Sequence, residues 1–235
     1  MKVGIIGAMA SEVALLKEKL NEPQVSCIAG MEFCQGSLGG TDVVVVQSGI
    51  GKVNAGICAQ ILVDRFGVSH IINTGVAGSL DDRLDVGDLV VSTDCVWHDF
   101  DVTPLGYRPG EIPGVGTINF PADEGLRNAT LAAAAEVAPD IHAYAGRIVS
   151  GDQFVSSTEQ KMRIVEGFGG MCCEMEGTAI AQAAWLNEVP FVIVRAISDK
   201  PGAADQVVDY NTFEEKAARD CAAIVAHMVA SQLCD

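Results

Sequence analysis

The sequence predicts an α/β protein with a mixed, mostly parallel sheet. Strand-like and helix-like segments alternate along the whole chain, which is the pattern of strands joined by helical crossovers. The segments KVGIIG and FVIVRAI are almost continuously apolar, as expected of strands buried on both faces of a sheet. No composition break, repeat or low-complexity segment divides the chain, so we expect one domain with a single core over residues 1–235.

The first third of the chain predicts four strands and two helices. A buried strand over residues 2–7 precedes a helix over residues 12–20, with Ser11 as its N-cap. Glycine-rich turns, of which GSLGGTD is the clearest hairpin, join three more strands over residues 25–28, 32–38 and 41–47. The segment SGIGKVNAG then leads into a helix over residues 53–66.

The middle of the chain alternates in the same way around one long loop. A buried strand over residues 68–75 is closed by VAGSL, and a Gly-Asp turn separates two strands over residues 84–91 and 95–99. Residues 100–121 are rich in Gly and Pro and have no period, which predicts a long loop of the kind that carries function. We then expect a helix, a strand, the loop SGDQFVSS and a short helix, over residues 122–138, 143–149, 150–157 and 159–166.

The stretch over residues 171–200 organises the rest of the chain. Its carboxylates Glu174 and Glu176 stand near the start of a helix, and after Pro190 comes a buried strand; these two elements cover residues 175–186 and 191–197. The chain closes with a loop and a long amphipathic helix, over residues 201–210 and 212–233.

Composition excludes several classes of protein. The net charge is −16 and no basic cluster occurs, which argues against nucleic acid and anionic membrane surfaces as partners. No apolar run approaches the roughly 18 residues that span a bilayer. Hydrophobic residues make up 49% of the chain, and we expect the surplus to cover an oligomer interface. The eight cysteines show no metal-ligand spacing and predict reduced thiols in a cytoplasmic protein.

Cofactor motifs are absent as well. Gly49, Gly51 and Gly56 resemble a dinucleotide fingerprint, but Asn54 stands where its third glycine belongs, and no P-loop occurs. The four histidines have neither zinc-ligand nor catalytic-triad spacing. We therefore expect no cofactor and no metal.

Three carboxylates follow strand-like segments. Glu12 comes after KVGIIG, Glu176 after MCC, and Asp199 after FVIVRAIS, so a parallel topology would gather them at one crevice. Singly, the two glutamates fit first-turn helix acids and the aspartate fits a turn equally well. A fourth residue favours a site: Arg195 lies inside an apolar strand, where a guanidinium needs a carboxylate and hydrogen bonds to offset its desolvation.

Seven segments stand in order between Met1 and about Ala230: GIIGAMASEVALL, SGIGKVNAG, INTGVAGSL, HDFDVT, SGDQF, CEMEGTAIA and FVIVRAISD. Together they resemble the bacterial 5′-methylthioadenosine/S-adenosylhomocysteine nucleosidases of the nucleoside phosphorylase/hydrolase superfamily. The resemblance implies a three-layer α/β/α fold with a central mixed sheet. It also implies hydrolysis of the N-glycosidic bond of methylthioadenosine, adenosylhomocysteine and 5′-deoxyadenosine, which releases adenine and a 5′-substituted ribose.

The resemblance assigns a role to each polar residue. Adenine is a poor leaving group, and Asp199, positioned by Ser198, would be the acid that protonates its N7. Glu12 would activate water on the opposite face of the sugar, as the base of an inverting glycosidase does. Glu176 would bind the ribose 2′- and 3′-hydroxyls and stabilise the developing cation. Two neighbours would orient the water and balance the charge: Arg195 and Glu174.

The remaining pocket positions carry over from the same resemblance. Contacts to the ribose and adenine are implied for Val76, Ala77, Gly78, Phe154, Val155 and Met175. Contacts to the 5′-thio group are implied for Met9, Ile50 and Tyr210. The partner subunit of a homodimer would complete that pocket with Val102, Leu105 and Pro113. Without the resemblance, several of these apolar residues fit an ordinary core equally well.

Three departures from the family pattern leave the preferred 5′-substituent open. Val76 replaces a serine, Leu105 an aromatic residue and Tyr210 a phenylalanine, and residues 200–209 form a slightly longer segment. Alternative functions are a nucleosidase for another 5′-modified nucleoside such as aminodeoxyfutalosine, a purine nucleoside phosphorylase, and a catalytically silent nucleoside-binding protein. An acid at Glu12 disfavours the phosphorylase because it would repel phosphate.

Overall fold

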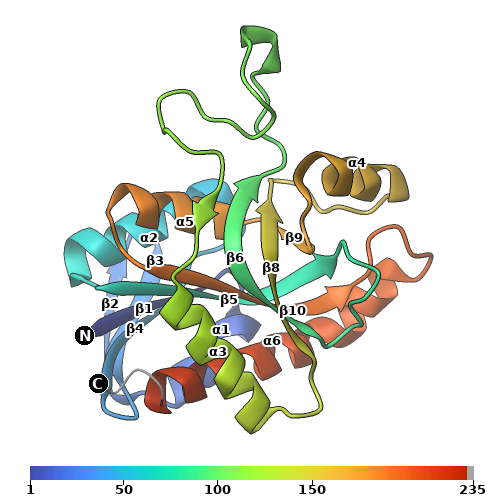
Figure 1. Ribbon diagram of the computed structural model, residues 1–235. Coiled ribbons are helices and arrows are strands. Elements are labelled where there is room, and N and C mark those ends of the chain that lie inside the picture. The colour runs from blue at the N-terminus through green and yellow to red at the C-terminus, as the bar shows by residue number, and fades with distance from the viewer. Residues whose placement is uncertain (232–235) are drawn as a thin grey trace.

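A mixed ten-stranded sheet between layers of helices forms the described part of the computed structural model, residues 1–231 (Figure 1). The strands are β1 (Lys2–Gly7), β2 (Asn21–Ile28), β3 (Met31–Leu38), β4 (Thr41–Gln47), β5 (His70–Ser79), β6 (Leu89–Trp97), β7 (Phe120–Pro121), β8 (Ala143–Ser150), β9 (Cys172–Glu174) and β10 (Phe191–Asp199). The helices are α1 (Ala10–Glu18), α2 (Lys52–Phe66), α3 (Glu124–Val137), α4 (Thr158–Phe168), α5 (Gly177–Leu186) and α6 (Gln206–Ser231), with a 3₁₀ turn η1 (Thr103–Leu105).

Helices cover both faces of the sheet. On β1, Val3 and Ile5 point into a core shared with α1, α3 and α6, while Ile6 points into a second core shared with α2 and α5. This alternation is the two-residue period of a strand buried on both faces. Figure 1 shows the two helix layers on either side of the strands. The three-layer α/β/α prediction is confirmed.

The strand order brings several strand ends to one edge. It runs β10-β6-β8-β9-β5-β1-β4-β3-β2, and β10 also pairs with β5, so β5, β10, β6, β8 and β9 close into a ring. The neighbours β1, β5 and β10 are parallel, and their carboxyl ends therefore lie together. The strands β2, β3 and β4 form an antiparallel meander at the other end of the sheet.

The structure corrects the strands predicted around residue 90. The two strands predicted over residues 84–91 and 95–99 are one strand, β6, that begins after a turn. Ser92 and Asp94 look like a polar break in the sequence, but both are buried and satisfied. Ser92 accepts a hydrogen bond from the β10 backbone (2.9 Å), and Asp94 pairs with Arg147 (2.6 Å). Likewise, VAGS does not close the preceding strand but continues β5 to Ser79.

Two predicted helix starts were wrong. Helix α1 begins at Ala10 with Met9 in the N-cap position, so Ser11 lies inside the helix and instead donates a hydrogen bond to Glu214 (2.6 Å). Helix α6 begins at Gln206 and not near residue 212, which shortens the preceding loop and places Tyr210 on the helix. The predicted end of this helix at Leu233, and the thiol of Cys234, lie outside the described residues.

The remaining boundaries moved by a few residues. Asp123 caps α3 by accepting a hydrogen bond from Leu126 N (2.8 Å), so this helix starts at Glu124. Glu176 occupies the N-cap position of α5, while Glu174 ends β9. The long loop before α3 projects from the body of the molecule (Figure 1). Within residues 1–231, no helix is both long and apolar enough to cross a membrane.

Candidate active site

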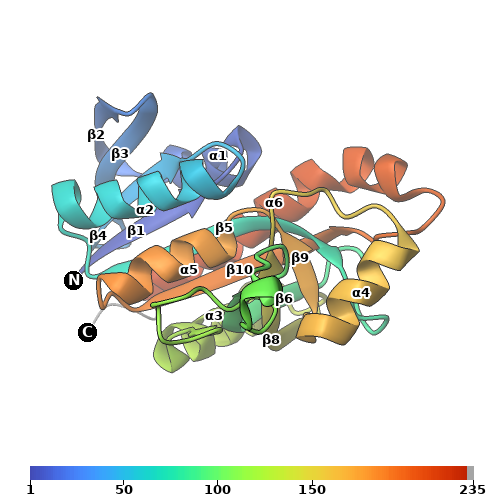
Figure 2. The same cartoon turned by 90° about the horizontal axis from the view of Figure 1, so that it is seen from above.

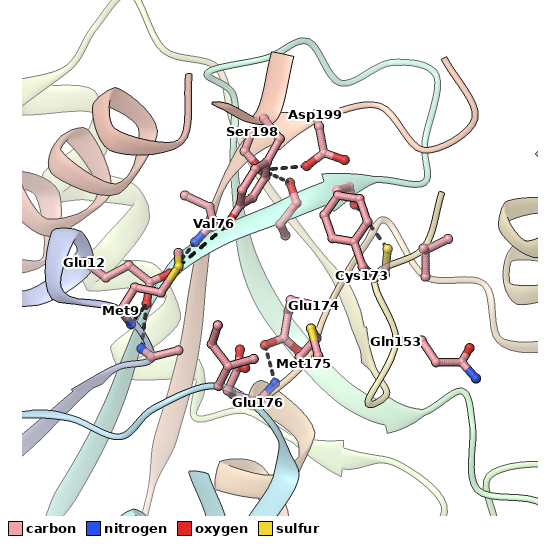
Figure 3. Close-up of a pocket in the computed structure, with 17 residues that line it drawn as sticks. Met9, Glu12, Val76, Gln153, Cys173, Glu174, Met175, Glu176, Ser198 and Asp199 are labelled. Carbon is pink, nitrogen blue, oxygen red and sulfur yellow. Dashed lines mark hydrogen bonds between the residues drawn. The ribbon is translucent and has the colours of Figure 1, made fainter. Parts of the chain in front are cut away.

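One pocket lies at the edge where β1, β5 and β10 end (Figure 3). Seventeen side chains or backbone segments line it: Ala8, Met9, Glu12, Ile50, Val76, Ala77, Gly78, Gln153, Phe154, Val155, Cys173, Glu174, Met175, Glu176, Ser198, Asp199 and Tyr210. The three carboxylates that we expected at strand ends, Glu12, Glu176 and Asp199, all lie in this pocket.

Glu174 and Glu176 reach the pocket although the strand that leads to them, β9, is not parallel to β1, β5 and β10. Strand β9 runs antiparallel to β5, with Cys173 opposite Gly78. Because β5 extends four residues past Gly75, β9 runs back along this extension towards the pocket. Glu174 and Glu176 therefore lie beside the ends of β1 and β10 although their own strand points the other way.

Arg195 lies beneath the pocket and is completely buried. Its Nη2 donates to Glu174 and to Asn73 Oδ1. Its guanidinium also lies 3.9 Å from Glu12 Oε1 and 3.8 Å from Glu176 Oε2. Three carboxylates thus surround one cation, which meets the expectation that a buried guanidinium needs such partners.

Gly75 makes this convergence possible. It lies on β5 opposite Arg195 of β10, and a Cβ added there would collide with both the Arg195 guanidinium and the Glu12 carboxylate. Only a glycine leaves the space in which the cation and the carboxylate approach each other across the strand.

Glu12 is held by the backbone at the end of β1. Its Oε2 accepts hydrogen bonds from Ala8 N (2.6 Å) and Met9 N (3.0 Å), and its Oε1 accepts one from Val76 N (3.1 Å). Burial raises the pKa of Glu12, and Arg195 and the three backbone donors oppose that rise. These bonds fix the position of the Glu12 carboxylate at the edge of the pocket.

Glu176 lies across the pocket from the β5 backbone. Its Oε1 accepts a hydrogen bond from Gly51 N (2.8 Å), which ties the start of α5 to the start of α2. Burial, reinforced by the negative charge of Glu174, raises the pKa of Glu176 to about 7. This side chain can therefore exchange a proton near neutral pH.

Among the three glutamates around Arg195, Glu174 has the most hydrogen bonds to the protein itself. Its Oε2 accepts hydrogen bonds from the backbone of Glu176 (3.0 Å) and Gly177 (2.7 Å), and Ser150 donates to its Oε1. Together with the Arg195 contact, these bonds use both oxygens of the carboxylate. Glu174 consequently holds Arg195 and the first turn of α5 in place.

Asp199 lies on a different wall and has only neutral hydrogen-bond partners. Ser198 Oγ donates to its Oδ1 (2.7 Å), and Gln206 Nε2 donates to its Oδ2 (2.7 Å). Burial raises the pKa of Asp199, and the two donors lower it only in part. These hydrogen-bond partners of Asp199 are uncharged, whereas Glu12, Glu174 and Glu176 lie beside the positively charged Arg195.

The rest of the pocket is apolar. The rings of Phe154 and Tyr210 pack edge to face with centroids 5.6 Å apart, and Tyr210 Oη lies 3.6 Å from Met9 Sδ. Ile50 and Phe154 line the entrance and remain 53% and 48% exposed. A ligand with one polar face and one apolar arm would match this division of the surface.

Comparison with known proteins now decides the family. A model described as the phosphorylase superfamily matches residues 2–230. A 5′-methylthioadenosine/S-adenosylhomocysteine nucleosidase of Staphylococcus haemolyticus is 41% identical over 229 residues, which is 97% of this chain and 98% of the relative. The chain belongs to this nucleosidase family.

Solved structures agree with this assignment. A nucleosidase of the same name from Colwellia psychrerythraea, in complex with adenine, superposes with a TM-score of 0.94 at 41% identity and covers 99% of this chain and 96% of its own. A futalosine hydrolase of Helicobacter pylori superposes with a TM-score of 0.91 at 32% identity, over 97% of both chains. Enzymes named for two different activities therefore share this fold.

Three predicted residues of this nucleosidase chain lie away from the pocket. Val102, Leu105 and Pro113 belong to the long loop between β6 and β7, and Leu105 is 74% exposed. They do not line the pocket of their own chain. Their predicted role across a dimer interface remains a proposal.

Sequence reasoning missed five polar residues around the nucleosidase site. Asn73 interrupts an apolar strand in the way that Arg195 does and could have been found by the same criterion. Three others, Ser150, Gln153 and Cys173, lie in the segments SGDQF and CEMEGTAIA that carry the resemblance, but no role followed from their residue types. Nothing in the sequence distinguishes Gln206 from a surface residue.

Proposed function

We propose that this protein hydrolyses the N-glycosidic bond of 5′-methylthioadenosine and S-adenosylhomocysteine, and also that of 5′-deoxyadenosine. The products are adenine and the 5′-substituted ribose. One observation carries the proposal: Glu12 and Asp199, two buried carboxyl groups with different surroundings, lie on different walls of one pocket (Figure 3). The family to which the chain belongs takes its name from this reaction.

Asp199 acts as the acid in this mechanism. Departure of adenine requires a proton on the purine, and a donor must still hold its proton near neutral pH. Burial raises the pKa of Asp199, which favours the protonated form, and Ser198 orients the carboxyl group. Proton donation to N7 then neutralises the leaving base as the bond breaks.

Glu12 acts as the base. Its carboxylate is fixed by three backbone donors, and the Arg195 charge favours its ionised form although burial opposes it. A water molecule held by this carboxylate attacks the sugar carbon on the face opposite adenine. The proton of the water passes to Glu12, and the new C–O bond replaces the C–N bond.

The carboxylates around Arg195 stabilise the sugar. Glu176 binds the ribose 2′- and 3′-hydroxyls and supplies negative charge below the carbon that becomes cationic. Arg195 and Glu174 fix the position of Glu176 and balance the charge of the group. Backbone and apolar contacts from Val76, Ala77, Gly78, Phe154, Val155 and Met175 complete the nucleoside site.

The 5′-substituent occupies the apolar part of the pocket, bounded by Met9, Ile50 and Tyr210. We place Val102, Leu105 and Pro113 of the partner subunit on its open side, which makes the protein a homodimer. Exposure of about half of Ile50 supports a second chain at that position. The seven cysteines within residues 1–231 are free thiols, which supports a cytoplasmic protein.

The match to a futalosine hydrolase supports a second candidate, a nucleosidase for a larger 5′-modified nucleoside such as aminodeoxyfutalosine. The acid and base chemistry would be the same. The two candidates differ only in the group beyond the 5′ carbon, and the departures at Leu105 and Tyr210 lie in the part of the pocket proposed for that group.

The test is adenine release in phosphate-free buffer. Purified protein is incubated with methylthioadenosine, adenosylhomocysteine, 5′-deoxyadenosine and aminodeoxyfutalosine, and the products are resolved by mass spectrometry. We expect adenine and free methylthioribose from the first substrate, and no adenine from a Glu12→Gln control. A sugar 1-phosphate formed only with added phosphate would indicate a phosphorylase, and binding without adenine release would indicate a silent binder.

A further inference from the structure

Gln206 makes contacts that no assigned role explains. It is 3% exposed at the first position of α6. Its side-chain Nε2 donates to Asp199 Oδ2 (2.7 Å) and to the backbone carbonyl of Val155 (2.8 Å). Its Oε1 accepts from Gly202 N (3.2 Å). One NH₂ group therefore bridges the proposed acid and the backbone segment expected to bind the base.

An adenine base presents the same arrangement of donors. Its amino group and N7 share one edge, so an acid that donates to N7 through one oxygen leaves its other oxygen facing the amino group. The second hydrogen of the amino group then needs another acceptor, and a backbone carbonyl beside the acid supplies it. Asp199 Oδ2 and the Val155 carbonyl are such a pair, and Gln206 Nε2 binds both.

We propose that the carboxamide of Gln206 is an internal stand-in for the amino group of adenine, and that a nucleoside binds only by displacing it. The inference rests on the function proposed above. Gln206 competes with the base for Asp199 and Val155 and does not contact the reacting atoms. The amino group of the incoming adenine replaces the two donated bonds, whereas a 6-oxopurine, which has an acceptor at this position, cannot.

Displacement involves the start of α6. The bond from Gly202 N to Gln206 Oε1 links the side chain to the loop after β10, and Tyr210 lies one helical turn further on. Moving Gln206 therefore breaks contacts within this loop as well as the two bonds to the pocket. Wild-type protein therefore binds adenine less tightly than a protein without these contacts would, because breaking them costs free energy.

The experiment compares wild-type protein with Gln206→Met, which keeps the length of the side chain and removes its donors. Affinity for adenine is measured by calorimetry, and kcat and KM are measured with methylthioadenosine. We expect the variant to bind adenine about tenfold more tightly and to have a KM about tenfold lower, a change of about 1.4 kcal/mol. We expect kcat to be unchanged, because Gln206 leaves before the reaction.

Two controls keep the outcome decisive. Val208→Ala alters an exposed residue of the same helical turn (64% exposed) and should leave both affinities unchanged. A crystal structure of the wild-type protein with adenine should show the amino group on Asp199 and the Val155 carbonyl, with Gln206 moved away, and it does not depend on the variant folding.

Weaker adenine binding by Gln206→Met, or Gln206 still bonded to Asp199 beside bound adenine, would overturn the inference. Neither result would affect the proposed function, which fails only if wild-type protein releases no adenine from the nucleosides tested.

Discussion

The partners of each buried carboxyl group separate the acid from the base in this pocket. Glu12 and Asp199 are both buried, and burial raises the pKa of each. Arg195 lies close to Glu12 and opposes the rise there, whereas the contacts of Asp199 are the neutral donors Ser198 and Gln206. Titratable groups whose surroundings differ in this way are the usual basis of acid and base assignments. The geometry therefore favours Asp199 as the proton donor.

Asp199→Asn tests this assignment. The amide keeps the size of the side chain but has no acidic proton, so we expect turnover of methylthioadenosine to fall on the order of 10²- to 10⁴-fold. Binding of an uncleavable adenosine analogue should change far less, because the pocket keeps its shape. Single-turnover rates and the analogue dissociation constant measure the two effects. Near-normal turnover would assign the proton transfer to another group.

Glu176→Gln tests the cost of the buried carboxylate. The pKa of Glu176 rises from 4.5 to about 7, so the folded protein holds a proton that the unfolded chain has already released. Wild-type stability therefore falls as the pH rises from about 4.5 to about 7, by about 3 kcal/mol in total for this group. Below that window both states are protonated and the penalty is absent.

The glutamine variant lacks this titration and can still accept the bond from Gly51 N. We expect it to match wild type in urea unfolding at about pH 4 and to be more stable at about pH 8, while losing activity through the ribose contact. A variant less stable than wild type at the higher pH would show that the charge of Glu176 is needed by Arg195.

At the scale of elements, the sequence correctly predicts the strands and loops whose position depends on a local run of apolar residues or glycines. The apolar strands β1 and β10 and the glycine-rich loop before α2 are where the sequence places them. The direction of β9 could not be predicted, because its three residues are too short to show a period and its direction is set by pairing with β8 and with the extension of β5. The start of α6 was also not predicted, because Gln206 is held there by side-chain hydrogen bonds to Asp199 and to the backbone of Val155, which no helix pattern in the sequence reveals.

The start of α6 also carries Tyr210, and Tyr210→Ala tests its role. The variant removes the ring that packs on Phe154 and contacts Met9. An aromatic pair contributes about 0.5–1.5 kcal/mol beyond area burial, so we expect kcat/KM for methylthioadenosine to fall about 3- to 10-fold. The fall should differ for adenosylhomocysteine, whose longer arm meets other residues. An equal loss for both substrates would place Tyr210 away from the 5′ group.

At the scale of the whole molecule, the face formed by helices α2 and α5 carries exposed apolar side chains. Helices α2 and α5 lie side by side (Figure 2), and each carries exposed apolar side chains: Val53 (72%) and Ile57 (44%) on α2, Trp185 (42%) and Leu186 (63%) on α5. Leu105 on the loop is 74% exposed. Exposed apolar side chains on neighbouring helices are typical of a subunit interface. The entrance residue Ile50 stands two residues before the start of α2, so the beginning of this helix borders the pocket.

Val53→Asp tests whether this face joins two subunits and completes the pocket. If the exposed side chains of α2 form the proposed interface, a carboxylate at position 53 would be buried there without a partner. We therefore expect wild type to sediment as a dimer and the variant as a monomer. If Val102, Leu105 and Pro113 of the partner subunit close the 5′ pocket, the monomer should also show a higher KM for methylthioadenosine. Val25→Asp is the matched control, because Val25 is similarly exposed (61%) but lies on β2, the edge strand of the sheet, and not on α2 or α5. A monomeric variant with an unchanged KM would separate the two ideas: the face would be the interface, but each pocket would be complete within its own chain.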